Sequence, residues 1–93
     1  NIMTEKNMKI YELPNAVYPL AVIARAHKID YQLYLERQHN YELQLKAAAA
    51  ENNELIRIYY RTKLADSAEA ARKALFDKHN AERYIAEYFR MNK

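Results

Sequence analysis

Residues 29–64 read IDYQLYLERQHNYELQLKAAAAENNELIRIYYRTKL, and the fold depends on how this stretch is interpreted. Apolar side chains recur at every second position through most of it, and polar or charged side chains fill many positions between them. Such alternation is typical of β-strands with one buried and one solvated face. The stretch therefore predicts three antiparallel strands, joined by turns at residues 38–40 and at Asn52-Asn53, where asparagine tolerates a positive φ.

Helices are expected on both sides of this sheet. The spacing of apolar residues predicts a helix from about Ala16 to His27, beginning near Pro19. After the strands, Asp66-Ser67-Ala68-Glu69 has the form of a capping box and predicts a helix start. We expect an interruption at residues 77–80 and a second helical piece from Ala81 to Met91, with a terminal strand as the alternative. The predicted fold class is α+β: a three-stranded antiparallel sheet with helices packed on one face, in α-β-β-β-α order.

An all-α helical bundle or coiled coil is the alternative fold. Ala, Glu, Lys, Leu and Arg supply 48 of the 93 residues, and Ala47 to Ala50 is poor strand sequence. A heptad passes through Tyr41, Leu45, Ala48, Asn52, Leu55 and Tyr59, with Asn52 as a polar core position. The strand interpretation is preferred because this helical seam would leave other apolar side chains outside: Leu33, Leu35, Leu43, Ile58 and Leu64.

Length and composition set limits on function. Residues 1–93 suffice for one small domain, with 1–13 as an N-terminal arm that is either flexible or strand-forming. With 51% hydrophobic and 29% charged residues, a folded chain is expected. Cysteine and glycine are both absent, which excludes disulfides, thiolate chemistry, phosphate-binding glycine loops and the hydrolase nucleophile elbow. The longest apolar run, Ala16 to Ala24, is too short to cross a membrane, and a cytoplasmic location is expected.

No constellation of catalytic or metal-binding residues is recognisable in the sequence. Ser67 is the only serine, and the predicted capping box accounts for it. The histidines His27, His39 and His79 lack the spacing of helical metal ligands. We therefore expect a protein that is not an enzyme and that needs no cofactor and no metal.

Two sets of residues are candidates for binding. On one side of a predicted strand, basic and aromatic side chains interleave and are joined by a lysine of the neighbouring strand, a combination that suits phosphates and bases. These candidate nucleic-acid-binding residues are Lys46, Arg57, Tyr59, Arg61 and Lys63. The net charge of +3 is mild for such a role. The second set is a C-terminal apolar stripe that suits a protein interface: Tyr84, Ile85, Tyr88 and Phe89.

These patterns favour a small non-enzymatic regulatory or accessory module that acts by protein–protein interaction or self-association. The expected partner is another protein or a second copy of the chain, with no membrane. The alternatives are a nucleic-acid-binding domain that uses the basic and aromatic sheet face, and a structural subunit of a larger assembly.

The predicted element order across about Pro14 to His79 resembles, in topology alone, the double-stranded RNA-binding domain. That family opens its second helix with paired lysines, whereas the matching residues here, Asp66-Ser67-Ala68-Glu69, are acidic. The family's functional residues therefore find no counterparts in this chain.

Overall fold

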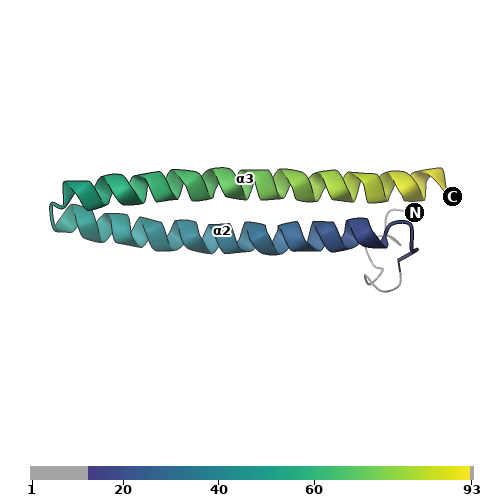
Figure 1. Ribbon diagram of the computed structural model, residues 1–93, viewed down its shortest axis with the longest axis horizontal. Helices are drawn as coiled ribbons and strands as arrows, with labels where there is room; N and C mark the ends of the chain where they lie inside the picture. Colours follow the sequence, from purple (N-terminus) through teal and green to yellow (C-terminus); the bar gives the residue numbers. More distant parts are fainter. Residues whose placement is uncertain (1–12, 93) are drawn as a thin grey trace.

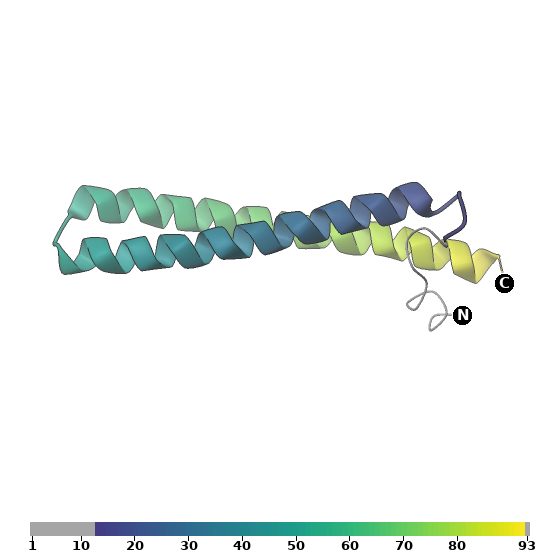
Figure 2. The ribbon, with the colours of Figure 1, turned by 90° about the horizontal axis from the view of Figure 1, so that it is seen from below.

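The computed structural model describes residues 13–92 and shows two long helices joined by a tight turn (Figure 1). Helix α2 spans Tyr18–Ala50 and helix α3 spans Glu54–Met91. They run antiparallel, side by side along nearly their whole length, and form a hairpin of 61 × 18 × 17 Å. Figure 2 shows α2 crossing over α3 near the middle of the hairpin, as coiled helices do. Residues 1–12, which include most of the predicted N-terminal arm, lie outside the described part.

Local sequence explains where α2 begins. Pro19 lies in the first turn, where its missing N–H and fixed φ fit a helix start. The carbonyl of Pro14 accepts hydrogen bonds from the backbone N–H groups of Val17 and Tyr18, both at 3.0 Å. Val17, which immediately precedes the helix, is only 1% exposed and packs the start of α2 into the hairpin core. The predicted start of this helix is confirmed, but its predicted end at His27 is wrong, because the helix continues to Ala50.

The turn between the helices is built from two asparagines. Asn52 has a φ of 56°, in the left-handed region that asparagine tolerates better than most residues. Asn53 caps α3, since its side-chain oxygen accepts a hydrogen bond from the Ile56 N–H at 3.2 Å. Glu54 adds a negative charge to the first turn of α3, where the helix dipole favours it. The predicted turn at Asn52-Asn53 is therefore confirmed, although it joins two helices instead of two strands.

The helices meet along a seam with alternating spacings of three and four residues, the heptad pattern of coiled coils. Every seam residue is buried or half-buried. On α2 and the residue preceding it the seam comprises Val17, Leu20, Ala24, His27, Tyr31, Tyr34, Gln38, Tyr41, Leu45 and Ala48. On α3 it comprises Arg57, Tyr60, Leu64, Ser67, Ala71, Ala74, Lys78, Ala81, Ile85 and Tyr88. The core is thus one line of side chains between two helices.

The two helices contribute side chains of different size to the middle of the seam. The fully buried positions in the middle of α3 are Ser67, Ala71 and Ala74, whereas the half-buried middle of α2 carries tyrosines. Tyr41 of α2 stands against Tyr60 of α3, with 6.0 Å between ring centroids. A tyrosine ring can bury its face in the seam while its hydroxyl stays in water. Much of the tyrosine excess is therefore explained by packing.

The predicted α+β fold is wrong: no strand occurs among residues 13–92, and the all-α alternative describes the chain. The alternation in residues 29–64 has a helical cause. Residues two apart lie about 200° apart around a helix, so apolar residues at every second position fall in turn on opposite sides. Tyr31, Tyr41 and Leu45 face α3, whereas Ile29 and Leu33 face away from it. The pattern indicates a helix with two apolar sides.

Further expectations change with the fold. Asp66-Ser67-Ala68-Glu69 lies inside α3, where Ser67 is a buried seam residue and caps nothing. The expected interruption at residues 77–80 is absent, since α3 runs through it without a break. The likeness to the double-stranded RNA-binding domain is lost with the sheet. The heptad considered for the alternative fold is right at Tyr41, Leu45 and Ala48, but Asn52 lies in the turn and the seam then resumes in a different frame.

Candidate interaction surface

The side of α2 that faces away from α3 carries a second line of apolar residues. We call it the outer stripe, and it comprises Val22, Ala26, Ile29, Leu33, Leu43 and Ala47. Its members follow a spacing of four and three residues, offset by about half a turn from the seam. All six are exposed, and the four larger side chains are between 41% and 56% exposed. Helix α2 is therefore apolar on two opposite sides.

Two polar residues interrupt the outer stripe near its middle. Glu36 and Asn40 continue the same spacing between Leu33 and Leu43, and both are exposed. Arg37 lies beside them, with its guanidinium carbon 5.3 Å from the centroid of the Tyr34 ring on its own helix. The centre of the outer stripe thus offers a carboxylate, an amide and a guanidinium within one turn of helix.

The surface of α3 carries both ion pairs and apolar side chains. Six of its large apolar residues are between 50% and 80% exposed: Leu55, Ile58, Tyr59, Phe76, Tyr84 and Met91. Two half-buried seam cations pair with exposed glutamates: Arg57 with Glu54 at 2.9 Å and Lys78 with Glu82 at 3.1 Å. Near its C-terminal end, Glu87 pairs with Arg90 through two hydrogen bonds. That hydrogen bonding, reinforced by the positive charge of Arg90, lowers the pKa of Glu87 below its ordinary value. Such solvated ion pairs are typical of a helix side that meets water.

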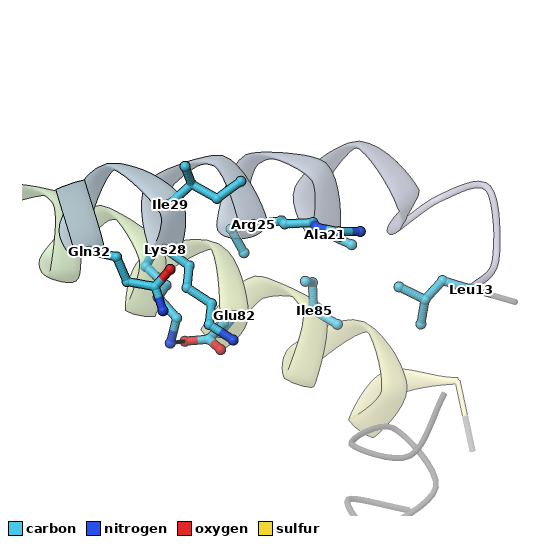
Figure 3. Close-up of a pocket in the computed structure, with 10 residues that line it drawn as sticks. Leu13, Ala21, Arg25, Lys28, Ile29, Gln32, Glu82 and Ile85 are labelled. Carbon is cyan, nitrogen blue, oxygen red and sulfur yellow. Dashed lines mark hydrogen bonds and ion pairs between the residues drawn. The ribbon is translucent and has the colours of Figure 1, made fainter. Parts of the chain in front are cut away.

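A groove of about 560 Å³ opens between the helices near the end opposite the turn (Figure 3). Arg25, Lys28 and Lys78 supply positive charge along it, and Glu82 neutralises one of these groups by pairing with Lys78. Ile85 points from α3 toward α2 and forms part of its apolar lining. The groove is open and its cations are surface groups, so it shows no built site for a specific ligand.

A smaller cleft of about 190 Å³ lies on another part of the seam. Its lining includes His27, Asp30, Tyr34, Lys73 and Asp77. Across residues 13–92, however, no three histidine, aspartate or glutamate side chains are arranged so that they could hold a metal ion. The cleft is therefore a small surface depression beside the seam, lined by charged side chains and without a metal site.

The helical structure separates the residues that were predicted to bind nucleic acid. Residues two apart point to opposite sides of a helix, so the flat basic and aromatic face that motivated the prediction does not form. Arg57 lies half-buried in the seam and pairs with Glu54, while Arg61 is exposed. Lys63 sits 5.5 Å from the ring centroid of Tyr59, which is itself 52% exposed. Lys46 lies on α2.

The predicted C-terminal interface is also divided between two sides of α3. Ile85 is 8% exposed and belongs to the hairpin core, and Tyr88 is a half-buried seam residue. The Tyr88 ring meets Phe89 edge-on at 5.5 Å between centroids. Tyr84 points outward and is 60% exposed. Part of this stripe therefore packs within the chain itself.

The outer stripe of α2 was missed in the sequence, although a signal for it exists. Its spacing of four and three is visible from Val22 to Leu33 and again from Leu43 to Ala47. The two runs keep one phase across Glu36 and Asn40. Four members of the stripe also belong to the alternation at every second position and are predicted as strand residues: Ile29, Leu33, Leu43 and Ala47. Val22 and Ala26 fall in the helix predicted from about Ala16 to His27.

Neither similarity to known proteins nor a membrane-spanning segment helps to assign this surface. No protein-family model, curated protein or solved structure matches the chain. Neither of the two helices within residues 13–92 contains a stretch that is both long and apolar enough to traverse a bilayer. The assignment of the outer stripe as a candidate interaction surface therefore rests on the structure of this chain alone.

Proposed function

We propose that this chain is a structural subunit of a larger helical assembly, in which another helix covers the outer stripe of α2. The observation that carries the proposal is that α2 is apolar on two opposite sides while α3 covers only one. A helix with apolar residues all round is typically buried, whereas a surface helix keeps its outer side polar. The side of α3 opposite its seam is mostly polar and includes Asp66, Glu69 and Arg83, all exposed. In the assembly α2 would therefore be the inner helix and α3 the outer one.

The shape of the hairpin supports the same proposal. A single seam between two helices gives a narrow core, and protein domains usually bury their apolar faces between layers of several elements. Large exposed apolar side chains in a row, such as Ile29, Leu33 and Leu43, are a feature of surfaces that bind other proteins. The length of α2 would give an incoming helix several turns of contact.

The regulatory or accessory role expected from the sequence is compatible with this surface and stays a prediction. Nucleic-acid binding has lost the sheet face on which it was based. The absence of enzymatic activity, the use of a protein partner and the cytoplasmic location are likewise retained as predictions. The structural role is favoured because the stripe runs along the length of a rigid helix instead of forming a compact patch at one end.

The proposal can be tested by cysteine accessibility, since the chain has no cysteine of its own. An Ile29→Cys variant, made in the cells that naturally produce the chain, is treated with a large maleimide before and after denaturation. We expect slow labelling in the native assembly and rapid labelling after denaturation. A Glu69→Cys variant on the exposed side of α3 is the control and should label rapidly in both states. Equal native labelling at the two sites would refute the proposed burial.

A further inference from the structure

We propose that the partner of the outer stripe is a second copy of this chain, bound antiparallel with the two-fold axis on the outer side of α2, level with residue 38. This inference rests on the proposed function and names the partner. The two α2 helices would lie against each other, and each α3 would lie on the far side of its own α2. All members of the outer stripe are exposed, although Ile29 also borders the groove between the helices, so the described hairpin leaves the stripe open to this approach.

The outer stripe is self-complementary in this orientation. With the axis at this level, a residue that precedes position 38 faces the residue of the partner subunit that follows position 38 by the same number of residues. Ile29 then faces Ala47 of the partner subunit, a large side chain against a small one. Leu33 faces Leu43 of the partner subunit. The overlap runs from Ala26 to Ala50, about 37 Å at 1.5 Å per residue, and so uses most of α2.

The polar centre of the stripe matches in the same register. Glu36 faces Asn40 of the partner subunit, and the same pair recurs on the other side of the axis. The Asn40 amide can donate a hydrogen bond to the Glu36 carboxylate, and Arg37 of the partner subunit lies one turn from that asparagine. A buried carboxylate is tolerated only when hydrogen bonds or opposite charges satisfy it. The antiparallel register supplies the hydrogen bond.

A parallel arrangement of the same faces is less favourable. It would place Glu36 against Glu36 of the partner subunit, two like charges in the middle of an apolar interface. Its advantage would be two kinds of attractive pair between the subunits at the exposed edges of the interface. Arg25 would approach Asp30 of the partner subunit, and Lys46 would approach Glu51 of the partner subunit. Pairs between exposed groups contribute little, because water screens them and the long side chains lose freedom. The central repulsion therefore outweighs the rim pairs, and the antiparallel arrangement is preferred.

The antiparallel arrangement has one unfavourable contact. Arg37 approaches Arg37 of the partner subunit close to the axis. Arg37 is exposed and lies over the Tyr34 ring of its own helix, so the two guanidinium groups can remain apart in water. Repulsion between such rim charges is weak compared with apposed carboxylates inside the interface.

Disulfide cross-linking distinguishes the possible orientations, because no native cysteine interferes. Leu33→Cys and Leu43→Cys are prepared separately and oxidised mildly, alone and mixed. We expect a cross-linked dimer from the mixture and little from either variant alone, since residue 33 faces residue 43 of the partner subunit and not its own copy. Efficient linking of Leu33→Cys to itself would show a parallel arrangement and overturn the inference.

Sedimentation equilibrium of the purified chain gives the second measurement. The parent chain should form dimers, and Leu33→Glu should weaken dimerisation by roughly tenfold or more, because it places a carboxylate in the apolar part of the interface. Phe76→Glu is the matched control: Phe76 is 65% exposed on α3, away from the outer stripe, and its replacement should change the dissociation constant less than about twofold.

The remaining outcomes separate this inference from the proposed function. A single-hairpin mass at high concentration, with no cross-link in the mixture, would overturn the second copy as partner. If Ile29→Cys were still protected in native cells, a different chain would cover the stripe and the structural role would stand. If Ile29→Cys were freely labelled as well, both the inference and the proposed function would fail.

Discussion

Replacing Ile85 with alanine tests whether the C-terminal apolar residues belong to the hairpin's own core. Ile85 is 8% exposed in the seam, whereas Ile58, on the same helix, is 50% exposed and provides a matched control. Isoleucine to alanine removes three carbons, or about 2.4 kcal/mol of burial at ~0.8 kcal/mol per carbon. Alanine's higher helix propensity returns a few tenths of a kcal/mol at either site. We expect I85A to lower the free energy of unfolding by about 2 kcal/mol and I58A by less than about 1 kcal/mol.

Urea denaturation followed by far-ultraviolet circular dichroism measures both losses. In a thermal scan, I85A should lower the Tm by roughly 8–16 °C, at about 4–8 °C per kcal/mol for a chain of this size. All three proteins must be compared at one low concentration, because self-association makes stability depend on concentration. If Ile85 served chiefly as an anchor for a partner, I85A would leave the isolated hairpin as stable as I58A does. Equal losses from the two variants would therefore refute its place in the core.

Three further changes test single features of the helices. Asn53→Ala removes the cap that accepts the Ile56 N–H and should cost about 1 kcal/mol in urea denaturation; an unchanged midpoint would contradict the cap. Ser67→Ala should raise stability by up to roughly 0.5 kcal/mol through helix propensity, whereas a capping serine would instead lose about 1 kcal/mol. Arg90→Gln should raise the pKa of Glu87 toward its ordinary value in an NMR titration, and an unmoved pKa would exclude the pair as its cause. Because folding lowers the Glu87 pKa, the pair's small contribution is present above the unfolded-state pKa and is lost as pH falls through the folded-state value.

Two boundaries predicted from the sequence are confirmed: the helix start near Pro19 and the turn at Asn52-Asn53. Four others are wrong, because the helices run through them without a break: the helix end at His27, the turn at residues 38–40, the helix start at Asp66 and the interruption at residues 77–80. The helix start at Pro19 and the turn at Asn52-Asn53 follow from residues whose backbone preferences are strong and local. The choice between strand and helix for residues 29–64 needed a weighting of two signals. The high helix propensity of alanine-rich segments such as Ala47 to Ala50 favoured a helix, and the alternation was given more weight.

The candidate surface was missed for a related reason. Alternation was interpreted as one buried face and one solvated face, and a helix with apolar residues on two sides gives nearly the same sequence. The four-and-three spacing of Val22 and Ala26, inside the predicted helix, continues without a break through Ile29 and Leu33, beyond the predicted helix end at His27. That continuity would have distinguished a longer helix from a strand. Ser67 shows the same limit, since its local sequence has the form of a capping box while the tertiary contacts make it a seam residue. Local motifs indicate what a segment can form, and packing decides which form is used.

The distance between spin labels placed at Lys28→Cys and His79→Cys tests the closed hairpin most directly. Both sites are exposed, one on each helix, and Lys28 lines the same groove as Lys78. Dilution with unlabelled chain keeps the measurement within single molecules. The hairpin predicts a narrow distribution at no more than about 30 Å, given a cross-section of 18 × 17 Å and the length of the label arms. A distance near 75 Å, expected at about 1.5 Å per residue if the helices joined into one rod, would contradict the hairpin and the outward stripe that depends on it.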